Sequence, residues 1–260
     1  MKTSLFVVEG PHDSAAICRV LKLNGFRSVN KKEEVPMCLK GLIPVSYPFS
    51  GDSLDRVAPI PHFLKEGEER CAAVCVAVGD SNIVNKLCLT LKNMDIRNMG
   101  QVMAVGILLD ADKKEVASRK KKLQQEIEKS CTEQDWNVEG NVLKLYGQKI
   151  PYVIYALPDD EKEGTLEDVL LPEQEWEYKD LKCLADDFVR QVPAMYRSGW
   201  KNADEKKVKV GVISNVLKPG KANQISILEC KWFTEESIET ISVHKKFAEF
   251  VLRVARWERG

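Results

Sequence analysis

Residues 101–114 read QVMAVGILLDADKK and contain an apolar run that ends in two acids. The run from Val102 to Leu109 is rich in Val, Ile and Leu, which is typical of a strand buried on both faces of a sheet. It finishes at Asp110 and Asp112, which lie on the same side of an extended chain because successive side chains alternate between faces. A core strand that ends in two carboxylates implies either a helix cap that uses them or a cation that needs them.

Strands and helices alternate on both sides of this stretch. Apolar runs predict strands at residues 4–10, 71–80 and 151–158, and apolar residues at helical spacing predict helices at the ranges that follow. Those helical ranges are 13–26, 81–95 and 113–131. This alternation predicts an α/β fold with a parallel sheet flanked by helices.

Two segments interrupt or follow the alternating core. Residues 27–70 are charged and contain five prolines, so we expect an insertion with at most one short strand or helix. Residues 1–157 are then the core, and residues 158–260 a mostly helical C-terminal extension that completes the site and packs on the core. Within the extension, residues 206–217 (KKVKVGVISNVL) are compatible with a strand by their alternation and with a helix by their later residues.

Composition limits the classes of function. Lys plus Arg equal Asp plus Glu at 39 each, so no global charge favours a nucleic-acid or membrane partner, although a local basic patch is compatible with this balance. The eight Cys and three His show no zinc-site spacing, which favours thiols in a reducing compartment. No apolar run of about 18 residues and no leader pattern occur, so we expect a soluble cytoplasmic protein with no membrane partner.

Acidic residues follow the predicted strands. The carboxyl ends of parallel strands meet at one edge of a sheet, where ligands of open α/β folds bind. Asp13 and Asp80 each precede a predicted helix and fit the N-cap position, as does Asp112 with an acid three residues on. Glu9 and Asp110 precede the helix starts, and burying an unpaired carboxylate costs several kcal/mol.

Convergence of these acids predicts a divalent cation. Neighbouring carboxylates raise each other's pKa unless a cation lies between them. Hard oxygen ligands favour Mg²⁺, Mn²⁺ or Ca²⁺, and Mg²⁺ is commonly held by one or two carboxylates together with water and substrate phosphates. The residues therefore predict an acidic metal site that acts on a phosphate group.

Three motifs resemble a known family. The stretches VVEGPHD (7–13), VAVGDSN (76–82) and GILLDAD (106–112) are similar to the Toprim domain shared by topoisomerases, bacterial primases, recombination mediators and OLD-family nucleases. The resemblance covers about residues 4–157. It implies a Toprim-like sheet in which Glu9, Asp110 and Asp112 hold Mg²⁺ or Mn²⁺ for phosphodiester chemistry, helped by Asp13.

The later stretch GTLEDVLL (164–171) is closest to OLD-type nucleases and small stand-alone Toprim proteins. That resemblance implies Glu167 as a further metal ligand, whereas Thr165 and Asp168 alone form a helix capping box around it. It also implies a catalytic lysine from the later region. Lys206, Lys207 and Lys209 are candidates, and we expect Lys207 to be the catalytic lysine.

The sequence departs from the family pattern in two places. Many Toprim domains carry a third acid two residues beyond the D-x-D pair, and Lys114 stands there, which weakens a topoisomerase or primase assignment. No P-loop motif occurs, so any ATPase is a separate chain and a protein partner.

The preferred hypothesis is therefore a metal-dependent nuclease that hydrolyses phosphodiester bonds in DNA or RNA. One alternative is a non-catalytic Toprim module that binds nucleic acid or a partner protein such as a separate ATPase. Another is a phosphotransferase or phosphatase for small molecules that uses the same acids.

Overall fold

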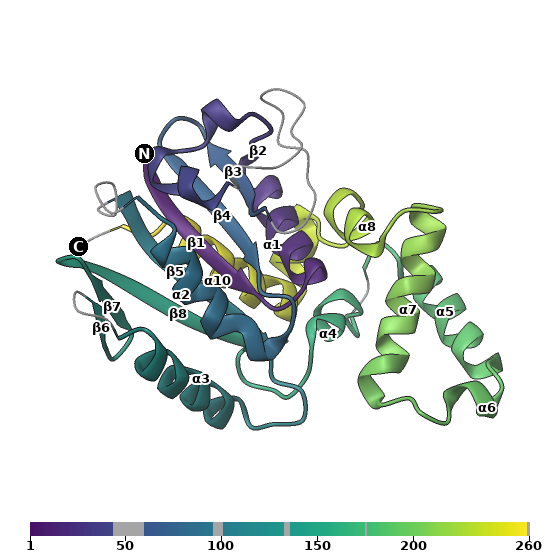
Figure 1. The fold of residues 1–260 in the computed structure, drawn as a ribbon. Coiled ribbons are helices and arrows are strands. Elements are labelled where there is room, and N and C mark those ends of the chain that lie inside the picture. The colour runs from purple at the N-terminus through teal and green to yellow at the C-terminus, as the bar shows by residue number, and fades with distance from the viewer. Residues whose placement is uncertain (44–59, 96–100, 133–135, 175, 259–260) are drawn as a thin grey trace.

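The computed structural model describes residues 1–43, 60–95, 101–132, 136–174 and 176–258. Their strands form one sheet with helices on both faces, in the order β2-β3-β4-β1-β5-β8-β7-β6 (Figure 1). The strands span Lys2–Val8 (β1), Arg27–Ser28 (β2), His62–Glu66 (β3), Arg70–Val76 (β4), Val102–Asp110 (β5), Trp136–Glu139 (β6), Val142–Leu145 (β7) and Gln148–Leu157 (β8). The fold is thus mixed α/β, as the alternating pattern predicts.

Helices of the first half of the chain connect the strands. They are α1 (Pro11–Leu23), α2 (Ile83–Lys92) and α3 (Val116–Ser130), with short 3₁₀ helices η1 (Lys32–Glu34), η2 (Met37–Leu42) and η3 (Asp80–Asn82). The second half contributes α4 (Leu166–Leu170), α5 (Lys179–Gln191), α6 (Ala194–Arg197), α7 (Asn202–Leu217), α8 (Asn223–Glu229), α9 (Glu235–Thr240) and α10 (Ser242–Ala255). Residues 206–217, which fit either a strand or a helix by sequence, therefore lie in α7.

The four central strands β4, β1, β5 and β8 pair in parallel. Val8 at the end of β1 pairs with Val76 of β4 and Leu108 of β5, and Asp110 of β5 pairs with Leu157 of β8. This register brings the carboxyl ends of all four strands to one edge of the sheet. The loops that carry the acids therefore begin side by side.

The sheet is mixed, because antiparallel pairs flank the parallel strands that the sequence predicts. Strand β3 pairs antiparallel with β4 and β2 pairs antiparallel with β3, while β6, β7 and β8 form antiparallel pairs at the other edge. Residues 27–70 were expected to be an excursion, yet their described ends supply two strands of the sheet. Each of the missed strands has two to five residues, too few for a clear alternation.

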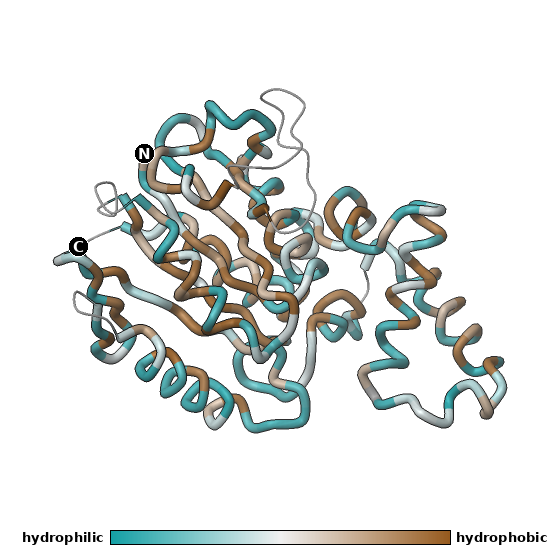
Figure 2. The backbone as a smooth tube through the Cα atoms, viewed as in Figure 1, coloured by the Kyte–Doolittle hydropathy of each residue, from teal (hydrophilic) through white to brown (hydrophobic). Residues whose placement is uncertain are grey.

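Strand β5 is buried on both faces, as its composition predicts. Its residues Val105 and Ile107 lie in the core with α2 and α3, whereas Ala104 and Leu108 lie in the core with α1 and α10. Figure 2 shows these central strands as the hydrophobic interior of the fold. Gly106 is needed for the packing, because a Cβ there would lie 2.9 Å from the Phe6 ring.

Helix α10 covers the face of the sheet opposite α2 and α3. The ring of Phe250 stacks on Tyr155 of β8 at 4.7 Å between centroids and meets Phe6 of β1 edge-on at 6.2 Å. The Ser4 hydroxyl donates a hydrogen bond of 2.8 Å to the Val254 carbonyl. The last helix is therefore part of the core of the sheet domain.

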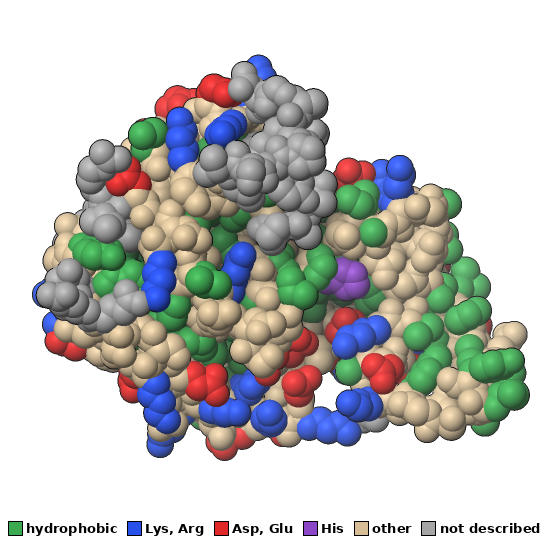
Figure 3. Space-filling view, in the orientation of Figure 1, with side chains coloured by type: hydrophobic (Ala, Val, Ile, Leu, Met, Phe, Trp, Pro, Cys, Tyr) green, Lys and Arg blue, Asp and Glu red, His purple; other side chains and the backbone are tan. Residues whose placement is uncertain are grey.

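Helices α5, α6 and α7 project to one side of the sheet (Figure 1). In α5 the side chains of Leu184 and Phe188 are 63% and 51% exposed, whereas Ala185 and Val189 are buried. Hydrophobic side chains gather over α5 and α6 in Figure 3. Among the described helices, none combines the length and hydropathy that crossing a membrane requires.

His244 joins α10 to α4 inside the core. It is fully buried, and its Nε2–H donates a hydrogen bond of 2.9 Å to the Val169 carbonyl, since a carbonyl can only accept. The Nδ1 atom lies 3.0 Å from the Ser237 hydroxyl. Burial lowers the pKa of His244 to about 4, so this ring is neutral in the folded protein near neutral pH.

Protonation of His244 is expected to destabilise the fold. In the unfolded chain the ring titrates near its ordinary value of about 6.5, so the unfolded state takes up the proton first as the pH falls. The contribution of His244 to the free energy of unfolding is therefore complete above pH 6.5 and declines by about 3 kcal/mol as the pH falls to about 4.

Urea unfolding of wild type and His244→Gln between pH 7.5 and 4 measures this effect. The difference in free energy of unfolding between the two proteins reports the contribution of His244, because the acidic groups titrate in both proteins. We expect this difference in free energy to decrease as the pH falls. A difference that stays constant with pH would contradict the conclusion that protonation of His244 destabilises the fold.

Candidate functional site

Glu9 and Asp13 lie at the junction of β1 and α1. Glu9 directly follows β1 and is half-buried, whereas Asp13 is buried in the first turn of α1. The Asp13 Oδ2 atom accepts a hydrogen bond of 2.8 Å from the Gly10 amide. Gly10, and not Asp13, is the N-cap residue, which corrects the capping prediction for Asp13.

Asp110 and Asp112 lie where β5 meets the loop between β8 and α4. The Asp110 Oδ1 atom accepts a hydrogen bond of 3.1 Å from the Leu166 amide, and the Asp112 amide donates one of 2.9 Å to the Gly164 carbonyl. Asp112 is exposed, with a left-handed φ of 55°, and α3 starts only after Glu115 at the N-cap position. Asp112 is therefore not the cap that its spacing suggested.

The same loop leads to Glu167 in the first turn of α4. Glu167 is 5% exposed and accepts a hydrogen bond of 2.7 Å from the Thr165 hydroxyl. The Thr165 amide donates a hydrogen bond of 3.0 Å to Asp168 Oδ2, as the capping-box pattern predicts. The helix cap thus uses Asp168. The charge of Glu167 instead acts on Asp13 and Asp110.

Glu9, Asp13, Asp110, Asp112 and Glu167 form what we call the carboxylate rim. Burial is the main cause that raises the pKa of Asp110 to about 8, and the charges of Asp13, Glu9, Glu167 and Asp112 add to it. Burial also raises the pKa of Asp13 to about 7, assisted by Glu9 and Glu167 and opposed by the Gly10 hydrogen bond. The five acids predicted from the sequence therefore interact within one electrostatic cluster.

The pKa of Glu9 is also raised, first by burial and then by the charges of Asp80 and Asp112. Asp80 is the first residue of η3, four residues after the end of β4, and its charge acts on Glu9 together with that of Asp112. Asp80 is not the N-cap of α2, since Asn82 holds that position. Its carboxylate instead pairs with Arg119.

Lys207 of α7 reaches the rim from the C-terminal helices. Its charge opposes the rise in the pKa of Glu9 and Asp13 and helps to lower the pKa of His12, after burial. The two neighbouring candidates have other partners: Lys206 pairs with Asp168, and Lys209 pairs with Asp186 and Glu205. In the described part of the chain Lys207 has no ion pair and is exposed.

His12 also belongs to this neighbourhood. It is half-buried, and the charge of Glu167 favours its protonated form while burial and Lys207 disfavour it. The sequence alone gave it no partner. Its electrostatic interactions with Glu167 and Lys207 depend on α4 and α7, which lie far from it in the sequence.

Arg119 is the residue that sequence reasoning missed most clearly. This side chain of α3 is 8% exposed; its Nη2 atom lies 2.5 Å from Asp80 Oδ1, and its Nε donates a hydrogen bond of 3.3 Å to the Asp110 carbonyl. It therefore joins the loops that follow β4 and β5. The signal in the sequence was its position on the buried stripe of α3, three residues after Val116 and four before Leu123.

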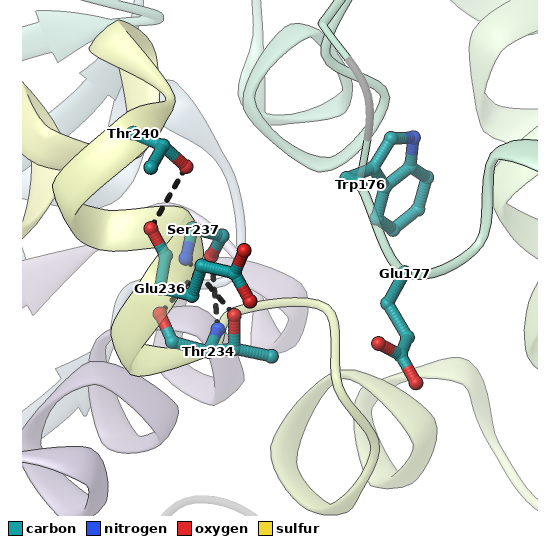
Figure 4. A pocket seen from close by; sticks show the side chains of 6 residues that line it. All are labelled: Trp176, Glu177, Thr234, Glu236, Ser237 and Thr240. Atoms are coloured by element: carbon teal, nitrogen blue, oxygen red, sulfur yellow. Dashed lines mark hydrogen bonds between the residues drawn. The ribbon is translucent and has the colours of Figure 1, made fainter.

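The carboxylate rim does not form a preformed metal-binding cage in the described residues. Among the described residues, no group of three or more His, Cys, Asp or Glu side chains is placed to hold a metal ion by itself. A cavity of about 190 Å³ lies beside the rim, lined by Asp80, Ser81, Leu109, Arg119, Lys122, Leu123 and Glu126. A cavity of about 280 Å³ elsewhere, lined by Trp176, Glu177, Thr234, Glu236, Ser237 and Thr240, contains none of the rim acids (Figure 4).

Comparison with known proteins gives a family and one distant structural neighbour. A family model described as a protein of unknown function (DUF3226) matches residues 3–255. The crystal structure of a hypothetical protein from Pyrococcus horikoshii OT3 is 18% identical, with a TM-score of 0.48 over 98% of this chain and 95% of that chain. No curated protein matches the sequence.

Replacing Arg119 by Met is expected to lower the free energy of unfolding by about 1–3 kcal/mol. The substitution removes the donor to the Asp110 carbonyl and the cation beside Asp80, whose side chain is 44% exposed and so keeps part of its hydration. Urea unfolding measures the change. Lys122→Met is the matched control. This side chain lies on the same helix and is 63% exposed, and its ion pair with Glu126 is long, at 3.7 Å. Equal losses in the two variants would contradict the structural role of Arg119.

Proposed function

The chain belongs to the DUF3226 family, and we propose that it is a Mg²⁺- or Mn²⁺-dependent nuclease with a Toprim-like carboxylate site. The observation that carries this proposal is the convergence of Glu9, Asp110 and Asp112 at the carboxyl ends of two adjacent parallel strands, β1 and β5. An edge of this kind repels an anionic substrate. A cation is needed before a phosphodiester can approach it.

The donor set fits a hard divalent cation. Among the described residues, the side chains of Glu9 and Asp112 make no hydrogen bond or ion pair, so their oxygens are available as ligands. Asp110 uses one oxygen for the Leu166 amide and retains the other. One or two carboxylates with water and substrate phosphate suffice for Mg²⁺, so a cage of three side chains is not required.

The buried acids have a different part in this proposal. Asp13 and Glu167 are held by hydrogen bonds from Gly10 and Thr165, which fix their positions beneath the exposed edge. Their negative charge increases the attraction of the site for a cation. Asp13 and Glu167 would bind the metal ion directly only if Glu9, Asp110 and Asp112 left coordination positions open.

A bound Mg²⁺ or Mn²⁺ supplies Lewis-acid stabilisation of a phosphate oxygen and lowers the pKa of a bound water. The protein then has to orient the scissile phosphate. Lys207 provides an exposed ammonium group beside Glu9 and Asp13, suited to a non-bridging phosphate oxygen. Arg119 joins the loops after β4 and β5 through Asp80 and the Asp110 carbonyl, and so helps to fix the position of Asp110.

A non-catalytic binding module is the second candidate, favoured by the exposed apolar side chains of α5 and α6. Leu184, Phe188, Met195 and Tyr196 are each at least half exposed. A surface of this kind suits a protein partner, such as a separate ATPase chain. In that case the metal would serve structure and no turnover would occur.

Cleavage assays with plasmid, single-stranded DNA and RNA test the catalytic proposal. With Mg²⁺ or Mn²⁺, Glu9→Gln and Asp110→Asn are each expected to lower the cleavage rate by about 100-fold or more, because each removes a charged ligand. Calorimetric titration with Mn²⁺ should show weaker binding in both variants.

Glu115→Gln is the matched control for these variants. It removes an exposed carboxylate at the start of α3, and we expect its rate to stay within about twofold of wild type. Salt-sensitive nucleic-acid binding without cleavage, unaffected by Glu9→Gln, would instead favour the binding module. Hydrolysis of nucleotides alone would select a phosphatase.

Lys207→Met separates the phosphate role from the metal role. The cleavage rate should fall by about 10- to 100-fold, while the affinity for Mn²⁺ stays equal or increases because a nearby positive charge has been removed. Lys221→Met, an exposed lysine beyond the far end of α7, is the control. A loss of rate accompanied by an equal loss of metal affinity would show that Lys207 acts only by supporting the fold.

A further inference from the structure

Two cysteines that are distant in the sequence meet between α2 and α3. Cys88 lies on α2 and is 7% exposed, and Cys131 is the fully buried C-cap residue of α3. They are 43 positions apart, and neither belongs to a C-x-x-C motif. Their proximity therefore could be seen only in the folded chain.

Their sulfur atoms are close enough for a bond. The two Sγ atoms lie 2.7 Å apart, about 0.7 Å more than the length of a disulfide bond. Both residues belong to one hydrophobic cluster, and Cys131 is held by a 2.9 Å hydrogen bond from its amide to the Ile127 carbonyl. A small movement of two side chains would bring the sulfurs to bonding distance without moving the helices.

We infer that Cys88 and Cys131 are a modification site, at which a peroxide converts the two thiols into a disulfide. The Cys88 sulfur, the more exposed of the two, loses its proton and attacks one peroxide oxygen, which gives a sulfenic acid and releases water from hydrogen peroxide. The Cys131 sulfur then attacks the sulfenic sulfur, forming the S–S bond and releasing a second water. In total two thiols lose two electrons and two protons to one peroxide.

The bond would close a loop that contains β5 and the whole of α3. Asp110, Asp112 and Arg119 all lie within this loop, between the two cysteines in the chain. Cross-linking restricts the unfolded chain, and for a loop of this length the melting temperature is expected to rise by roughly 5–15 °C. The disulfide would therefore stabilise the segment that presents the D-x-D acids. This effect does not depend on whether the protein cleaves nucleic acid.

Alkylation and mass spectrometry test the inference on the full wild-type chain. The reduced protein is exposed to hydrogen peroxide while folded and is then denatured and treated with N-ethylmaleimide. Eight cysteines react in the reduced protein, whereas six should react after oxidation, with an intact mass lower by about 2 Da before labelling. Proteolytic mapping should recover a peptide that links Cys88 to Cys131.

Two variants complete the test. Cys88→Ser should abolish the linked peptide and the rise in melting temperature, whereas Cys183→Ser, which removes an exposed cysteine of α5, should leave both unchanged. Mapping of wild type keeps the test decisive even where Cys88→Ser is unstable. Eight reactive cysteines after oxidation, or a disulfide between another pair, would overturn the inference.

Discussion

The parallel pairing of β4, β1, β5 and β8 determines where the loops of the site and their acids lie. It brings four strand ends to one edge, and acids follow each of them: Glu9 after β1, Asp80 after β4, Asp112 after β5 and Glu167 after β8. Gly106 of β5 helps to fix the register of this pairing, because a Cβ at this position would lie 2.9 Å from the Phe6 ring of β1. Burial of a strand and convergence of carboxylates are therefore two results of the same pairing.

Convergence has an energetic cost that the surrounding residues reduce only in part. Asp13, Asp110 and Glu167 each accept a hydrogen bond from the chain, and Arg119 pairs with Asp80 at the margin. Burial and mutual repulsion still raise the pKa of Asp13 and Asp110 to about 7 and 8. The site keeps an excess of negative charge that the described side chains leave uncompensated, which is the condition under which a cation or a proton binds.

Much of the central fold follows from the sequence, because it depends on local patterns. The alternation of apolar runs with helical spacing predicts β1, β4, β5 and β8 and the helices between them, and the acids at their ends are found by position alone. The antiparallel edge strands are too short to give a period. The caps were predicted wrongly at Asp13, Asp80 and Asp112, because a spacing of three residues does not fix the residue at which a helix begins.

The remaining features depend on contacts between distant segments, which no local pattern records. Lys207 and Glu167 reach the carboxylate rim only because α4 and α7 pack beside the loops of the sheet, and Arg119 appears in the sequence as one of several cations on a charged helix. Its burial distinguishes it, since a guanidinium group that is 8% exposed requires both a carboxylate and a carbonyl as partners. The stability of the β5 edge and the chemistry proposed for it thus rest on the same side chains. A cation at the rim would relieve the repulsion that Arg119 and Lys207 only partly offset.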